Sequence, residues 1–223
     1  DSRQTIRTVA IFAVASLIPA ALLMVTAFVR INIVLILLRQ ALGSPQVPGN
    51  QVLSALAIML TAIVMEPIGE QLYREAVVPL ASRKIGFEEA ISTGLRPIKT
   101  FMAMQIIRTN HENYLQELYK EAEPLRSESA YPENGEDYPL RILAPAFLLS
   151  ELTTALMMGF FLYLPFLVID LVVSAVLAAM GLFMLPPTMI AMPLKLILFV
   201  LADGWLLVSK SLLASFASGG PSP

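Results

Sequence analysis

Four ionisable side chains lie inside otherwise apolar stretches of the chain: Glu151, Asp170, Lys195 and Asp203. An ionised side chain at the centre of a membrane costs roughly 2.5 to 3.5 kcal/mol on insertion scales, so such residues are usually paired or functional. In a structural role, they would cap helices, pair with one another or meet another subunit. In a functional role, they would form a proton or ion relay.

Enzyme chemistry has little support in the residue types. Asp170 and Asp203 could form the proton-sharing carboxylate pair of an intramembrane aspartyl protease, but Asp203 lacks the flanking glycine pattern of such enzymes. His111, which precedes Glu112, is the single histidine, so a two-histidine metal motif is excluded. No phosphate-binding glycine loop or serine elbow occurs. We therefore predict no enzyme activity, no metal and no cofactor.

Bulky apolar residues and two prolines follow Gly181, in the order Leu182, Phe183, Met184, Leu185, Pro186 and Pro187. The pattern predicts a non-helical turn, because paired prolines cannot continue a helix. Apolar rings close pores by dewetting, and a thioether chain repacks around varied shapes. The turn is a candidate pore constriction, and the same residues would equally suit a turn packed inside a helical bundle.

The charges that surround these sites are distributed unevenly. Of the 32 Asp, Glu, Lys and Arg residues, 20 lie between residues 67 and 140, and none lies in residues 8–29, 152–169 or 171–194. Runs of about 18 to 20 apolar residues are long enough to cross a hydrocarbon core. Charged residues make up 14% of the chain, against about 25% in a soluble domain. The sequence predicts an all-α protein of membrane-associated helical hairpins with broken helices and a small, polar helical insert.

Two further features limit the partners and the chemistry. The formal net charge of −2 supplies no basic field for a phosphate backbone, which excludes nucleic acid as a partner. The absence of cysteine excludes disulfides, thiolate nucleophiles and zinc–thiolate sites.

An apolar hairpin is predicted at the start of the chain. Thr8–Val29 is interpreted as a retained helix, kinked at Pro19, rather than as a cleaved leader, because it is longer than a typical signal core. Glycine, serine and proline between residues 43 and 50 predict a turn. A second apolar helix is predicted over Val52–Met65.

The orientation of the hairpin follows from its basic residues. Arg30 and Arg39 precede the turn, and cytoplasmic loops are enriched in Lys and Arg, so the turn is predicted inside and the insert outside. The predicted domains are an N-terminal hairpin (1–66), a polar helical insert (67–140) that is periplasmic, and C-terminal apolar helices (141–223) with a pore-side turn at 181–187.

The insert is predicted to be helical and amphipathic. One face is striped at steps of three and four residues by Phe101, Met102, Gln105, Arg108, His111, Tyr114, Leu115, Leu118 and Tyr119. Between Glu121 and Pro139 the composition changes to that of a solvated linker.

The C-terminal part stays apolar for longer than one membrane span. Leu143–Met184 is interrupted by Glu151, Pro165 and Asp170, which fits either two helices or one broken helix. A proline in a membrane helix is tolerated where neighbouring protein satisfies the freed backbone groups, so Pro165 indicates packing against other helices. A final helix is predicted from about Pro193 to Phe216.

Five blocks of the sequence together resemble the FliP family. They are TAFVRINIVLILLRQALG (Thr26–Gly43), Asn50–Val52, PLRILAPAFLLSEL (Pro139–Leu152), PFLVIDLV (Pro165–Val172) and LPPTMIAMPLKLILFVLADGW (Leu185–Trp205). These blocks cover both apolar halves of the chain, whereas the insert matches only loosely.

The resemblance implies a core channel subunit of the flagellar type III protein export gate, in the bacterial inner membrane at the flagellar basal body. A pentamer-like homo-oligomeric ring, joined by FliQ-type and FliR-type membrane proteins, would enclose a channel for unfolded secreted proteins. Other export-gate components and membrane lipid would surround it. The junction Glu136–Arg141 and the LPP turn resemble flagellar members, and an injectisome export-gate subunit is the alternative.

By the same resemblance, Leu182–Pro187 corresponds to the family's methionine-rich gasket. Family members usually carry consecutive methionines, whereas this chain has Leu182, Phe183 and Met184, so the seal would be stiffer and more aromatic. Thr153 stands where the family usually has lysine, two residues after Glu151. Glu151 therefore needs another partner.

A small-solute or ion transporter is the rival from another class of protein. It would use Asp170 and Asp203 at broken helices near the middle of the membrane. Such proteins usually show paired halves, and the sequence has no internal repeat.

Overall fold

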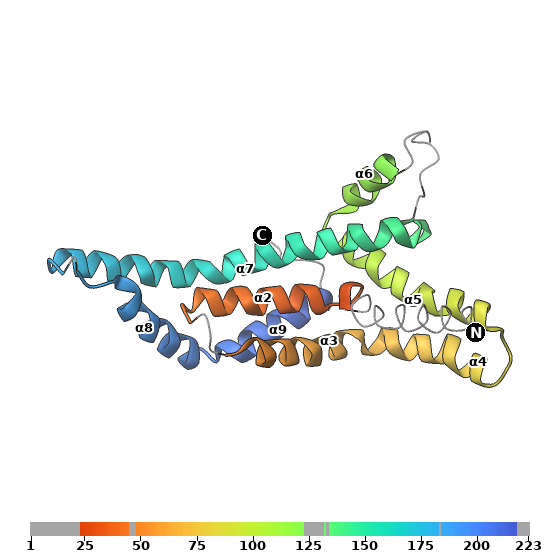
Figure 1. Ribbon diagram of the computed structural model, residues 1–223, viewed down its shortest axis with the longest axis horizontal. Coiled ribbons are helices and arrows are strands. Elements are labelled where there is room, and N and C mark those ends of the chain that lie inside the picture. Colours follow the sequence, from red (N-terminus) through yellow and green to blue (C-terminus); the bar gives the residue numbers. More distant parts are fainter. Residues whose placement is uncertain (1–22, 45–47, 123–131, 133, 183, 218–223) are drawn as a thin grey trace, which may run out of the picture. The chain divides into compact units, whose positions relative to one another are not determined.

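The computed structural model describes residues 23–44, 48–122, 132, 134–182 and 184–217. Every regular element in these ranges is a helix (Figure 1). The chain divides into two compact units: unit 1 holds residues 1–29 and 65–150, and unit 2 holds residues 30–64 and 151–223. The predicted all-α fold is confirmed. The predicted helix over Thr8–Val29, with its kink at Pro19, falls almost wholly outside the described residues.

Helix α3 extends from Asn50 to Leu72, beyond the end predicted at Met65. It passes through Pro67 without ending. A proline removes only one intrahelical hydrogen bond, and the Glu, Gln and Leu residues that follow favour a helix. The prediction placed the end of the helix too early because it treated the first charged residues as a boundary.

A π-helical turn, η1 (Tyr73–Val77), joins α3 to the short helix α4 (Val78–Ala81). The Val78 N–H donates to Tyr73 O, five residues earlier. Pro79 comes next, and its ring crowds the preceding turn of a helix while supplying no N–H. The wider π turn therefore accommodates this proline.

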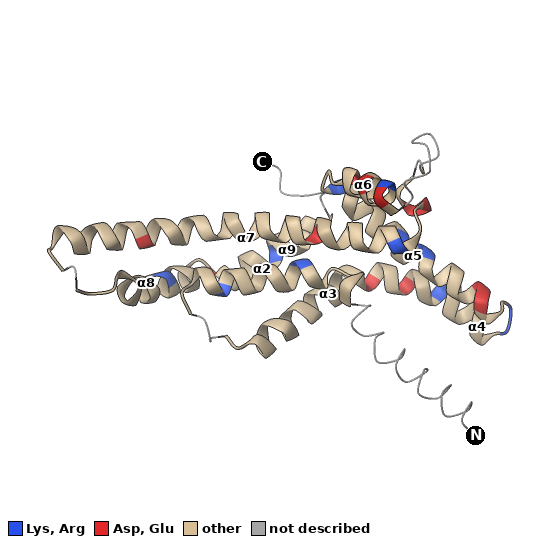
Figure 2. Cartoon of the chain, turned by 45° about the horizontal axis from the view of Figure 1, so that its top comes forward, with Lys and Arg blue, Asp and Glu red and all other residues tan. Residues whose placement is uncertain are grey.

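The polar insert contains the helices α5 (Phe87–Arg108) and α6 (Glu112–Ala122). Glu88 and Glu89 lie in the first turn of α5, where the helix dipole favours negative charge. Asn110, at φ 56°, separates the two helices, because a left-handed residue ends a right-handed helix. Charged residues are concentrated on this part of unit 1 (Figure 2).

One face of these two helices is buried within unit 1. The buried residues include Phe101, Met102, Gln105, Ile106, Leu115 and Tyr119. The Phe101 ring packs against Phe147 with ring centroids 5.9 Å apart, and Tyr119 meets Tyr138 edge to face at 5.3 Å. The predicted helical insert is confirmed, and its apolar stripe is what holds it on unit 1.

Helix α7 (Leu140–Ala179) has 40 residues and follows the short 3-10 helix η3 (Gly135–Asp137). It continues without interruption through Pro165, so the prediction of two helices or one broken helix here is wrong. The proline removes one hydrogen bond, whereas the apolar residues on both sides supply many turns of helix that outweigh this local cost.

The C-terminal region contains two helices, α8 (Pro187–Leu201) and α9 (Gly204–Ala217), bent by 67°. The single helix predicted from Pro193 to Phe216 is therefore wrong. The break lies at Asp203, whose φ of 49° is left-handed and cannot continue α8. This bent pair confirms the broken-helix part of the predicted fold.

Helix α2 (Phe28–Ala41) forms the core of unit 2. Its fully covered residues are Arg30, Ile31, Val34, Leu35, Leu38 and Ala41. A Cβ atom at Gly159 of α7 would overlap the Leu37 side chain, so α2 and α7 approach closely there. The Met192 side chain of α8 lies 3.6 Å from the Cβ position of Gly43, directly after α2.

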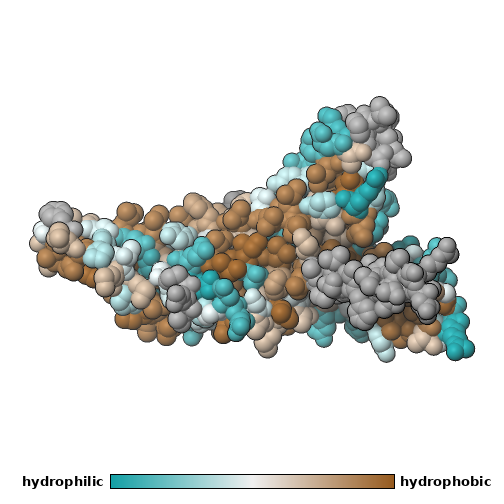
Figure 3. All heavy atoms as spheres, viewed as in Figure 1, coloured by the Kyte–Doolittle hydropathy of each residue, from teal (hydrophilic) through white to brown (hydrophobic). Residues whose placement is uncertain are grey.

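Two helical stretches of the described chain are long and apolar enough to cross a membrane, namely residues 50–81 and 140–179. The bent pair of α8 and α9 is a third if it counts as one span. Only 22% and 17% of the most apolar windows of the first two are buried. Apolar residues consequently make up much of the described surface on the face shown in Figure 3.

Candidate functional site

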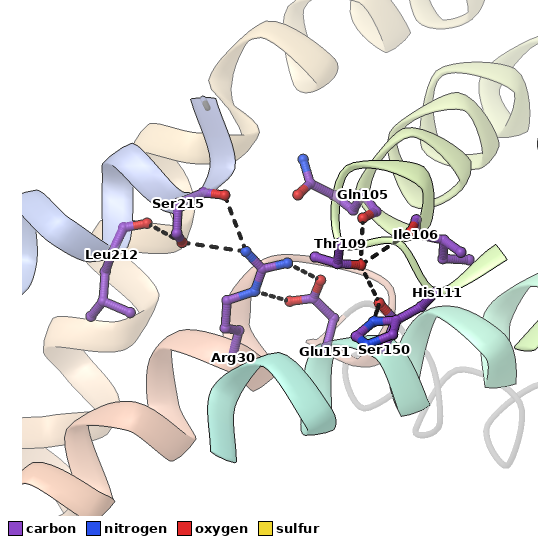
Figure 4. A network of polar contacts seen from close by, with 9 residues as sticks. All are labelled: Arg30, Gln105, Ile106, Thr109, His111, Ser150, Glu151, Leu212 and Ser215. Atoms are coloured by element: carbon purple, nitrogen blue, oxygen red, sulfur yellow. Dashed lines mark hydrogen bonds and ion pairs between the residues drawn. The ribbon is translucent and has the colours of Figure 1, made fainter. Parts of the chain in front are cut away.

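Glu151 of α7 forms a buried ion pair with Arg30 of α2 inside unit 2 (Figure 4). Arg30 Nε donates to Glu151 Oε2 at 2.8 Å, and Arg30 Nη2 donates to Glu151 Oε1 at 2.5 Å. Both side chains are 0% exposed. This two-pronged arrangement is the strong form of a charge-assisted hydrogen bond, and it gives Glu151 the partner that the sequence alone left undefined.

Helix α9 completes the surroundings of Arg30. Arg30 Nη1 donates to Ser215 O and Ser215 Oγ, both at 3.3 Å (Figure 4). The Phe216 ring lies over the guanidinium, 4.1 Å from Cζ to the ring centroid, which is a cation–π contact. One arginine thereby holds α2, α7 and α9 together.

Sequence reasoning used Arg30 only to orient the hairpin and missed it as a partner of Glu151. Glu151 was identified as an ionisable residue inside an apolar stretch, and the same criterion applies to Arg30. It lies between the uncharged run that ends at Val29 and the apolar run that begins at Ile31.

Asp170 and Lys195 form the second ion pair of unit 2, between α7 and α8. Lys195 Nζ donates to Asp170 Oδ2 at 2.6 Å and to Ala41 O, at the end of α2, at 3.1 Å. The Lys195 side chain is 6% exposed and that of Asp170 is 28% exposed. The ammonium therefore ties α8 to both α7 and α2.

Among the described residues, Asp203 forms no ion pair with Glu151, Asp170 or Lys195. It is exposed and lies at the bend between α8 and α9. Gly204 follows, and a Cβ there would overlap the Phe199 ring. The bend thus requires glycine after Asp203.

The apolar turn after α7 begins with Gly181 at φ 73°, a conformation that favours glycine. Leu182 N–H donates to Leu177 O, and Gly181 N–H donates to Ala178 O, which is the hydrogen-bond pattern of a Schellman cap. Met184 is 96% exposed, and Leu182 and Leu185 are also exposed. Phe183 lies outside the described residues.

A polar cluster in unit 1 engages the single histidine. Ser150 Oγ lies 2.8 Å from Thr109 Oγ1 and 2.9 Å from His111 Nδ1 (Figure 4). The His111 ring also stacks on Tyr114, with centroids 4.8 Å apart. In the described ranges, no group of three or more His, Cys, Asp or Glu residues is placed to hold a metal ion.

The fold and these contacts define a class: a helical protein with membrane-length apolar helices and two ion pairs inside an apolar bundle. The chain belongs to the FliP family, whose sequence model matches residues 11–212.

Three relatives show the extent of the match. The flagellar biosynthetic protein FliP of Buchnera aphidicola (from Acyrthosiphon pisum) is 45% identical over 97% of this chain, which spans 56% of that relative's length. The proteins of the same name from Caulobacter vibrioides and Bacillus subtilis are 43% and 41% identical over 98% and 95% of this chain. The match covers 79% and 92% of their respective lengths.

Proposed function

We propose that this protein is a core channel subunit of the flagellar type III protein export gate in the bacterial inner membrane, at the flagellar basal body. In this proposal several copies form a pentamer-like ring with FliQ-type and FliR-type membrane proteins, and unfolded flagellar proteins pass through it. Membership of the FliP family and the flagellar names of the relatives support it. The protein acts by gating rather than by catalysis, so other components supply the energy.

The observation that carries the proposal is the large apolar surface that unit 2 leaves open. On α7, Phe160, Val168 and Leu171 are 62%, 57% and 62% exposed, and on α8 Leu201 is 82% exposed. Four charged residues of the same unit are already paired with one another, and the large exposed surfaces that still need covering are apolar. Neighbouring subunits or lipid tails would supply that cover.

We assign residues 1–66 and 141–223 to the apolar, membrane-side part of the subunit and residues 67–140 to a periplasmic insert. The charged helices α5 and α6 belong to this insert. Their acidic and basic side chains are suited to water rather than to hydrocarbon.

The gasket of the channel is assigned to Leu182, Phe183, Met184, Leu185, Pro186 and Pro187. The nearly complete exposure of Met184 supports the assignment, because a side chain that packs on nothing in its own unit is free to meet copies of itself. The Schellman cap fixes where the turn leaves α7. Apolar side chains gathered from several copies would close the pore by dewetting.

Replacement of Leu182, Phe183 and Met184 by glycine tests the gasket. The assembled complex would keep its stoichiometry, measured by native mass spectrometry, while ion conductance through it in planar bilayers would rise. The matched control is Leu182→Met with Phe183→Met, which keeps the turn apolar and should keep the pore closed. Unchanged conductance of the glycine variant in an intact complex would remove the gasket assignment.

Co-expression with the FliQ-type and FliR-type proteins tests the proposal as a whole. Native mass spectrometry in mild detergent should detect a defined multi-copy complex that contains both. A monomer or dimer that never captures them would contradict the export-gate role. The rival transporter requires a monomeric, cation-coupled uptake that Asp170→Asn abolishes, and the pairing of Asp170 with Lys195 leaves its charge already compensated.

A further inference from the structure

Methionines are concentrated around the turn that joins α7 to α8 (Figure 1). Four of the 11 methionines of the chain lie within residues 180–192, namely Met180, Met184, Met189 and Met192. They are 65%, 96%, 72% and 37% exposed, respectively. Met192 is partly covered, because its Cγ lies 3.6 Å from the Cβ position of Gly43. Met184 is thus the most exposed methionine of the described chain.

The backbone at Met184 is non-helical, which limits the surroundings that this residue can have. Met184, Leu185 and Pro186 lie between α7 and α8 and belong to neither helix. Non-helical backbone does not face lipid tails, because its polar groups find no partners there, and at membrane depth it lines water or is buried in protein. The described chain does not bury Met184 or Leu185. The turn therefore lies at an aqueous surface or lines an aqueous channel.

A thioether in contact with water is open to oxidation. A sulfur lone pair attacks one oxygen of hydrogen peroxide, the O–O bond breaks, and the departing hydroxide takes up the remaining proton to leave water. The sulfur loses two electrons, the peroxide gains them, and the product is methionine sulfoxide. The chain has no cysteine, so no thiol of its own competes for the oxidant.

We propose that Met184 is a modification site at which hydrogen peroxide forms a sulfoxide, and that this polar group opens the constriction made by the apolar turn. The first half needs only the exposure of Met184, whereas the second half rests on the gasket assignment proposed above. An apolar constriction closes a pore by excluding water. A sulfoxide is polar and accepts hydrogen bonds, so sulfoxides from several copies would draw water into the constriction.

Two methionines of the same chain serve as internal references. Met102 of α5 is 0% exposed. Met59 of α3 is 67% exposed and belongs to unit 2, as Met184 does, but it lies within a continuous helix of membrane length. Lipid or detergent tails cover such a helix, and peroxide is poorly soluble in hydrocarbon. Comparing Met184 with Met59 therefore separates contact with water from simple lack of protein cover.

The first test measures the modification alone. The full chain, purified in mild detergent with the proteins that accompany it, is treated with hydrogen peroxide, and peptide mass spectrometry follows the gain of about 16 Da at each methionine. Met184 should be oxidised at least about tenfold faster than the buried Met102, and also faster than Met59. Equal rates of oxidation at Met184 and Met59 would remove the site.

The second test measures the effect on the pore. Ion conductance of the complex in planar bilayers should rise once Met184 is oxidised. Methionine sulfoxide reductases A and B, one for each sulfoxide epimer, should reverse the rise when supplied with a thiol reductant. Met184→Leu keeps the turn apolar but has no sulfur, so peroxide should not change its conductance from its own untreated value. The matched control Met59→Leu should respond to peroxide as wild type does.

The outcomes separate this proposal from the gasket assignment. Complete oxidation of Met184 with unchanged conductance, when the glycine variant of the turn does conduct, would overturn the gating effect and leave the gasket in place. Equal responses to peroxide by wild type and Met184→Leu would also overturn it, because another methionine would then be responsible. Unchanged conductance of both the oxidised protein and the glycine variant would contradict the gasket and the gating effect together, and the mass spectra alone would then decide the modification site.

Discussion

Replacing Glu151 by Gln is expected to destabilise unit 2 strongly. Arg30 and Glu151 are both 0% exposed and share hydrogen bonds of 2.5 and 2.8 Å. The substitution leaves the guanidinium buried without its counter-ion, and breaking a buried pair in this way costs about 3 to 5 kcal/mol. Because about 1.4 kcal/mol is a tenfold change, the ratio of folded to unfolded protein should fall by roughly two to three orders of magnitude or slightly more.

A double-mutant cycle separates the interaction energy between Arg30 and Glu151 from the cost of burying each charge. Arg30→Met also removes the contacts with Ser215 and Phe216, so it should cost at least as much as Glu151→Gln. The cycle consists of the single variants Arg30→Met and Glu151→Leu and the double variant that carries both. The double variant leaves no unpaired charge, and apolar residues of similar volume often replace a buried ion pair at little cost. The double variant should therefore be more stable than either single variant. The coupling energy of the two sites is the difference between its loss of stability and the sum of the two single losses.

The assay is denaturant unfolding of the purified protein in mild detergent, followed by the fluorescence of its single tryptophan. Trp205 packs edge to face on Phe199, with centroids 5.2 Å apart, and so reports on unit 2. The control is Glu70→Gln in unit 1, which removes an exposed pair with Arg74 at 3.9 Å. Such a pair contributes about 0.3 to 0.5 kcal/mol, so unfolding followed at Trp205 should stay close to that of wild type. The reasoning would be refuted if Glu151→Gln lay within about 0.5 kcal/mol of wild type.

Two further substitutions, Gly159→Ala and Lys195→Met, probe the packing of unit 2. Gly159→Ala should lower its stability by about 1 to 3 kcal/mol in the same unfolding assay, because the new methyl group overlaps Leu37. The control Gly69→Ala lies in the part of α3 that belongs to unit 1 and meets open space, so it should leave the stability of unit 2 unchanged. An equal loss of stability for the two variants would contradict the close approach of α2 and α7. Lys195→Met should cost about 2 kcal/mol, less than Glu151→Gln, because the Asp170 carboxylate it leaves unpaired is 28% exposed. A loss equal to that of Glu151→Gln would mean that water does not reach Asp170.

The helix boundaries show where local sequence reasoning failed. Pro67 and Pro165 both lie inside continuous helix, although proline is the strongest helix breaker. The real break in the C-terminal region is at Asp203, which the sequence pattern did not indicate. A proline acts on one hydrogen bond, whereas the bend at Asp203 depends on the left-handed backbone of that residue and on the close approach of Gly204 to Phe199, a packing detail that residue types alone do not specify.

Composition and pattern alone were sufficient for the all-α class and the polar insert, because apolar run length and helical periodicity are local properties of the chain. The FliP family was indicated by the resemblance of five sequence blocks. Tertiary structure alone decided which charges meet. Arg30 and Glu151 are 121 positions apart, and on an apolar helix nothing local specifies which neighbour a side chain will face. Packing around α2 brings these two residues together and leaves Arg39 without a carboxylate among the described residues.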